Sequence, residues 1–272
     1  MKQCPQILFY LTVAFLGLSY ALIVAIDVFN LFDLHTTFIA ANDRWYFWLF
    51  WFHNPVEAPI QWVGLATVAL VSLITARNAY QAEQSDQFRF SLLFSIAVIL
   101  MFVEDSLNPR HHLRLYLESQ DEVGYGMMGT LVELGYFAVL GGLLLFVFFR
   151  YRHVFWEHKR ARQFLIAGYV FYAIAVGSSW LGSAFRSTTD SFVDLYTVVG
   201  GFFTRLLFFD GAEREAYFHA INEHFAKTDR LPLEYWFMDY VWEESLELLG
   251  VSALLVATLV LFYDAGEDTS ES

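Results

Sequence analysis

Long, uninterrupted apolar runs constrain this chain more than any other feature. A helix needs about 20 mostly apolar residues to cross the roughly 30 Å hydrocarbon core of a bilayer. Because 57% of the 272 residues are hydrophobic, too little polar surface remains to cover such runs in a soluble fold. We therefore predict an all-α, polytopic transmembrane helix bundle that forms a single membrane domain over residues 1–272. Its six expected spans lie near residues 7–28, 59–76, 88–106, 128–149, 163–185 and 240–263.

One further apolar segment, Ser191 to Phe209, leaves the number of spans open. It is long enough to cross a bilayer, but it contains Asp194 and Arg205, and two opposite charges argue against a lipid-exposed span. We expect an interfacial or re-entrant helix there, followed by a polar helix that ends before Pro232. The external helical region would then cover residues 190–235. Seven spans are the alternative, and they would reverse the direction of the last one.

Positive charges predict the orientation of the spans. Cytoplasmic loops carry an excess of Lys and Arg, which places the loops after spans two and four inside. Both termini are then cytoplasmic, and we expect a bacterial inner membrane. The external loops are 29–58, 107–127 and 186–239. The basic residues of the two inner loops are Arg77, Arg89, Arg150, Arg152, Lys159, Arg160 and Arg162.

The external loops contain an aromatic block at residues 45–52. Because Trp and Tyr rings favour the headgroup level of a bilayer, we expect an interfacial aromatic segment there. The lipid bilayer is the expected partner, and the external loops offer a surface for another membrane protein. The formal net charge of −13 argues against nucleic-acid binding.

Acidic residues fall at a matching depth in three of the expected spans. Glu104, Glu133 and Glu247 each lie 16 residues from the cytoplasmic end of their span, which is about 24 Å along a helix. We therefore expect them to meet in one layer near the outer surface. Glu243 precedes Glu247 by four residues and is expected to share its helix face.

Two histidines in the second external loop would complete a metal site with these acids. Carboxylate and imidazole ligands suit iron, manganese or zinc, and a carboxylate-rich set favours iron or manganese. In the competing interpretation the acids are solvated or pair with nearby arginines, and the histidines are ordinary interface residues. The sequence names no catalytic residue. The candidate metal ligands are Glu104, Glu133, Glu243, Glu247, His111 and His112.

Arg110 and Arg114 are four residues apart, which predicts a pair that binds a lipid headgroup phosphate. Gly141, Gly142 and Gly177 lie within expected spans and predict close packing between helices. The spans lack the broken-helix signals and paired halves of many transporters, which counts against transport.

Motifs of the common membrane enzymes are missing from the sequence. It has no HExxH zinc motif, and none of its three lysines lies within an expected span, which excludes a Schiff base there. Three functions stay open. They are a metal-dependent enzyme acting on a lipid or other apolar substrate, a non-catalytic membrane subunit or assembly factor, and a proton- or cation-coupled transporter.

Overall fold

The structure is a computed structural model of the chain. It describes residues 4–41, 47–53, 57–110, 112–113, 116, 126–188, 198–203, 234 and 237–268. The described residues form helices and turns without a strand, so the predicted all-helical fold is confirmed. Among them, five helices are long and apolar enough to cross a membrane, which supports a membrane location. These five are Pro5–Val28, Ala58–Gln81, Ser85–Leu107, Lys159–Ser178 and Met238–Tyr263.

The fourth predicted span corresponds to helix α7, Gly126–Arg150, which has 25 residues. Within the described residues its apolar stretch, Leu134–Arg150, is shorter than a full crossing. The segment Ser191 to Phe209 is described only at residues 198–203, which are helical. Most of the external region 190–235 lies outside the described residues. The choice between six and seven spans therefore stays a prediction.

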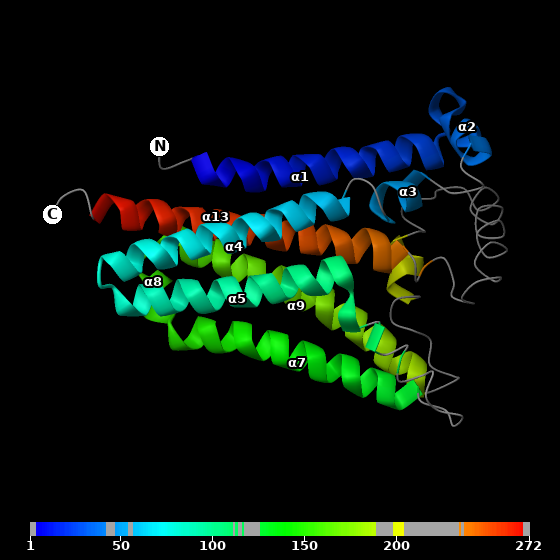
Figure 1. Ribbon diagram of the computed structural model, residues 1–272. Helices are drawn as coiled ribbons and strands as arrows, with labels where there is room; N and C mark the ends of the chain where they lie inside the picture. Colours follow the sequence, from blue (N-terminus) through cyan, green and yellow to red (C-terminus); the bar gives the residue numbers. More distant parts are fainter. Residues whose placement is uncertain are drawn as a thin grey trace. The chain divides into compact units, whose positions relative to one another are not determined.

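The chain folds into two compact units, each drawn from distant parts of the sequence. Unit 1 comprises Met1–Val13, Pro59–Ile174 and Glu247–Ser272, and unit 2 comprises Ala14–Ala58 and Ala175–Leu246. Figure 1 shows the helices α4, α5 and α7 of unit 1 running alongside one another. The helices that contribute to unit 1 include α4 (Glu57–Gln81), α5 (Ser85–Leu107), α7, α8 (Arg152–Trp156), α9 (Lys159–Thr188) and α13 (Glu244–Asp268).

Helix α13 packs closely against α9 in unit 1 because two glycines leave room for the neighbouring helix. A Cβ atom added at Gly250 would lie 2.7 Å from the ring of Tyr172. A Cβ atom added at Gly168 would lie 2.6 Å from the Leu254 side chain. Both distances are shorter than real contacts, so only glycine fits without a shift. Small residues at such contacts let helix backbones approach in membrane proteins.

Three glycines that the sequence predicts at close helix contacts have open space around them among the described residues. Cβ atoms added at Gly141, Gly142 and Gly177 would meet nothing within 4 Å in the described part of the chain. Among the described residues, the structure therefore gives these three glycines no close helix contact. A glycine inside an apolar run does not reveal which face of its helix meets a neighbour.

Unit 2 contains short helices that surround one buried aspartate. Asp27 lies in the π-helix η1, Val24–Val28, after helix α1, Cys4–Ile23. Its Oδ1 accepts from the backbone N–H of Phe47 at 3.2 Å, and its Oδ2 accepts from that of Trp48 at 2.9 Å. These residues begin helix α3, Phe47–His53, so Asp27 caps the helix amino terminus.

The aromatic segment at residues 45–52, which we expected at the headgroup level, is partly buried within unit 2. Within unit 2, the side chains of Trp48 and Phe52 are only 1% and 2% exposed. The Trp48 ring packs edge-on against Phe237, with 5.9 Å between ring centroids. Aromatic rings bury much apolar surface, and these two therefore serve the core of unit 2.

Candidate functional site

Polar side chains from three helices of unit 1 meet in one place. Gln61 and Trp62 lie near the start of α4, Glu104 and Asp105 near the end of α5, and Glu247 near the start of α13. A tight turn at residues 82–84 joins α4 to α5, which brings the start of one helix to the end of the other. With Arg110, these residues form what we call the carboxyl cluster.

The carboxyl groups of Asp105 and Glu247 lie near one another at the centre of this cluster. The Asp105 carboxyl interacts electrostatically with Glu247 and Glu104, and the Trp62 side chain lies beside it. On the other side, Gln61 Nε2 donates a hydrogen bond to Glu247 Oε2 at 2.6 Å. Like charges at close range disfavour each other's ionised form. The arrangement can therefore take up a proton or a cation at these acids.

Glu104 is held by an arginine that follows the same helix. Asn108 ends α5 in the left-handed conformation, with a φ of 45°, and its N–H donates to the Glu104 carbonyl. This turn brings Arg110 back over the helix end, where Nε lies 3.0 Å from Glu104 Oε1. The Arg110 guanidinium also lies 4.5 Å from the ring centroid of Phe137. The competing interpretation, that an acid pairs with a nearby arginine, therefore holds for Glu104.

Several polar atoms of the carboxyl cluster have unused hydrogen-bonding capacity. In native proteins most buried polar atoms are hydrogen-bonded, and exceptions often mark an unseen water or ion, or a catalytic role. Most of the exceptions among the described residues belong to this cluster, which makes it the strongest candidate site in the described part of the chain. The buried atoms of the cluster without a hydrogen-bond partner among the described residues are Gln61 Oε1, Trp62 Nε1, Glu104 Oε2, Asp105 Oδ2 and Arg110 Nε, of which Arg110 Nε forms an ion pair with Glu104.

The predicted metal ligands are only partly brought together. Glu104 and Glu247 both belong to the carboxyl cluster, whereas Glu243 ends the π-helix η3, Met238–Glu243, in unit 2. His112 is exposed. No group of three or more His, Cys, Asp or Glu among the described residues is arranged to hold a metal ion.

Three predicted site residues lie outside the description. The backbone of Glu133 belongs to α7, but its side chain is not described, and neither His111 nor Arg114 is described at all. A metal site that needs Glu133 and His111 therefore stays a prediction. Binding of a lipid phosphate by Arg110 and Arg114 also stays a prediction, and Arg110 already contacts a protein carboxylate.

Gln61, Trp62 and Asp105 were not among the predicted site residues, although the sequence holds a signal for them. The turn begins at Ala82 and ends at Gln84. Gln61 lies as many residues before the turn as Asp105 lies after it. Two helices joined by a tight turn place residues equally distant from it at the same depth. A count outward from the turn would have paired these two polar residues.

No family model, curated protein or solved structure matches the chain. The fold and the site define a class: a helical protein with candidate membrane-spanning helices and a polar cluster among its helices. Its function must therefore be argued from the chemistry of that cluster.

Proposed function

We propose that this chain is a six-span membrane protein that binds a proton at Asp105 and Glu247 as the coupling site of a proton-coupled transporter. In this proposal α7 is the additional span, both termini are cytoplasmic, and the carboxyl cluster lies toward the outer side. The observation that carries the proposal is the electrostatic interaction of Asp105 with Glu247, whose Oε2 accepts a hydrogen bond from Gln61 Nε2 at 2.6 Å. Acids inside a membrane bundle commonly form proton relays or ion sites.

Electrostatics makes a shared proton the simplest occupant. Two like charges inside a protein repel each other more strongly than they do in water. One proton between the acids removes most of that repulsion. We place the proton on Asp105, because Glu247 Oε2 already accepts from Gln61 whereas Asp105 Oδ2 has no donor among the described residues. The partnerless Asp105 Oδ2 is where a proton or a water molecule can be received.

Infrared difference spectroscopy of the purified protein tests the proton directly. A protonated carboxyl group absorbs separately from a carboxylate, so the wild-type protein should show a protonated band at neutral pH. The band should disappear in Asp105→Asn. Asp86→Asn is the matched control, since Asp86 is on the same helix but exposed, 2.9 Å from His153 Nε2. A wild-type protein without the band, or Asp105→Asn with the band unchanged, would overturn the proposal.

Proton flux tests the coupling step. Proteoliposomes loaded with a pH-sensitive dye and given a potassium diffusion potential should acidify with the wild-type protein. Asp105→Asn and Glu247→Gln should each lower the initial rate about tenfold or more, whereas Asp86→Asn should not. A normal infrared band without any flux would retain the proton site but refute proton movement that is independent of a second substrate.

Elemental analysis separates this proposal from the metal-dependent enzyme. The purified wild-type protein should contain no stoichiometric iron, manganese or zinc. A stoichiometric metal ion in the wild-type protein that is lost in Glu247→Gln would contradict the proton site. It would favour the metal-dependent enzyme instead.

A further inference from the structure

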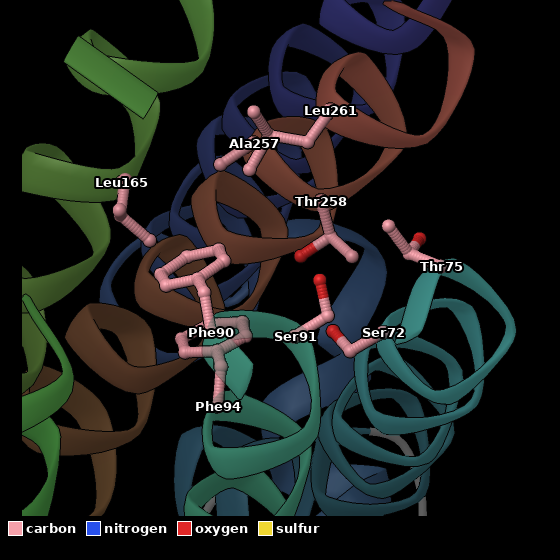
Figure 2. Close-up of a pocket in the computed structure, with 9 residues that line it drawn as sticks. All are labelled: Ser72, Thr75, Phe90, Ser91, Phe94, Leu165, Ala257, Thr258 and Leu261. Carbon is pink, nitrogen blue, oxygen red and sulfur yellow. The ribbon is translucent and has the colours of Figure 1, made fainter. Parts of the chain in front are cut away.

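A second polar region lies in unit 1, in a cavity that we call the hydroxyl cavity (Figure 2). Its volume is about 10 Å³, close to the space that one water molecule needs. All nine residues that line it are buried, so its polar atoms are shielded from the surroundings. Four of them carry hydroxyl groups. The lining residues are Ser72, Thr75, Phe90, Ser91, Phe94, Leu165, Ala257, Thr258 and Leu261.

The hydroxyl cavity is separate from the carboxyl cluster, although the same helices form both. On α4, Ser72 follows Gln61 by the same separation as Thr258 follows Glu247 on α13. That separation is about three helical turns, or about 16 Å, and it returns to the same helix face. The cavity therefore lies deeper along the same faces.

The hydrogen bonds of the cavity are incomplete. Thr258 Oγ1 donates to the Leu254 carbonyl at 2.8 Å, which leaves its oxygen free to accept. Ser72 Oγ has no partner among the described residues, and the Ser72 residue is only 2% exposed. In Figure 2 the hydroxyl oxygens of Ser72, Ser91 and Thr258 point toward one another from three different helices. A buried hydroxyl without a partner costs about 1–3 kcal/mol, so an occupant that bonds to it is favoured.

We propose that the hydroxyl cavity binds one water molecule, independently of the function of the carboxyl cluster. The water accepts hydrogen bonds from Ser72 and Ser91 and donates one to Thr258 Oγ1. Buried waters typically make about three such bonds, and truly empty cavities are apolar. Because these residues belong to α4, α5 and α13, the water links three helices in the core of unit 1.

The sign of one stability change tests this proposal. In a dry cavity, Ser72→Ala removes a partnerless hydroxyl and should raise the melting temperature. With a bound water it removes one of three bonds, so we expect the melting temperature to fall by about 2–4 °C. Ser95→Ala calibrates the loss of one direct bond, since Ser95 Oγ donates to the Ala69 carbonyl at 2.9 Å. A rise in Ser72→Ala would overturn the proposal.

A double variant and a cation series identify the occupant. Thr258→Val and Ser72→Ala should be less harmful together than the sum of their separate effects, since both lose the same water. Strict additivity would contradict a shared water. The melting temperature of the wild-type protein should not change when sodium or potassium is replaced by choline. A dependence on either cation would assign the cavity to that ion and overturn the proposal.

Discussion

Asp27 in unit 2 and Asp105 in unit 1 both place a carboxyl group inside the protein near the end of a candidate span, yet their surroundings differ. The Asp27 side chain is 0% exposed, and both its oxygens accept from backbone N–H groups of α3. By contrast, Asp105 Oδ2 is buried without a partner among the described residues, and two other acids repel its carboxyl group.

The difference teaches that burial alone does not identify a functional acid. Donors fill the oxygens of Asp27, so its negative charge stabilises the start of a helix. The surroundings of Asp105 leave hydrogen-bonding capacity unused and add like charge, which favours the uptake of a proton or an ion. The same substitution should therefore destabilise the protein at Asp27 and leave its stability nearly unchanged at Asp105.

The largest loss of stability is expected for Asp27→Asn. The amide group presents a donor to a backbone N–H, so one charged hydrogen bond and much of the cap are lost, about 2–4 kcal/mol. Thermal unfolding of the purified protein, followed by tryptophan fluorescence, measures the loss. Asp33→Asn, at an exposed position, is the control and should change little. The infrared carboxyl band and the proton flux should survive where the protein stays folded. Loss of the infrared band in folded Asp27→Asn would contradict the assignment of the proton to Asp105 alone.

Arg110→Met tests whether the acids of unit 1 need their neighbouring cation. The substitution leaves Glu104 without its partner beside two other acids. We expect a loss of about 2–3 kcal/mol, less than for a fully buried pair, because the Arg110 side chain is 21% exposed. Adding Glu104→Gln should restore most of the stability, since it removes the uncompensated charge. A double variant that melts no higher than Arg110→Met would show that Arg110 acts through packing on Phe137 instead.

Gly250→Ala disturbs the helix that carries Glu247 without changing any acid. Its Cβ atom would meet the Tyr172 ring at 2.7 Å, and overpacking of this kind costs about 1–3 kcal/mol. Gly142→Ala is the matched control at an open position, where the higher helix propensity of alanine should leave stability equal or slightly improved. Equal melting temperatures for the two variants would refute the close approach of α9 and α13.

The sequence predicts the helices far better than it predicts the site. Apolar run length places the candidate spans because every backbone group in a bilayer must bond within its own helix. The matched depth of Glu104 and Glu247 likewise follows from helical rise, and both belong to the carboxyl cluster. What run length cannot supply is the rotation of each helix about its axis.

That missing rotation explains the errors. It is why Gly250 packs closely while Gly142 has open space among the described residues, and why Asp105 interacts with Glu247 although the sequence did not predict it. Turn geometry also lies beyond hydrophobic patterning. The left-handed Asn108 turn is what directs Arg110 to Glu104, and no apolar run encodes it.

The smallest stability change is expected for Asp105→Asn. In our proposal Asp105 carries a proton, so the substitution replaces a neutral acid by a neutral amide of the same shape, and neither charge nor packing changes much. We expect the free energy of unfolding to change by less than about 1 kcal/mol, although the infrared band and the proton flux are lost. Thermal unfolding of Asp105→Asn and Asp27→Asn under identical conditions measures both changes in stability. If Asp105→Asn destabilises as strongly as Asp27→Asn, donors must hold the Asp105 carboxyl as they hold that of Asp27. Its role would then be structural, because hydrogen-bond donors to both oxygens stabilise the ionised carboxylate and disfavour protonation.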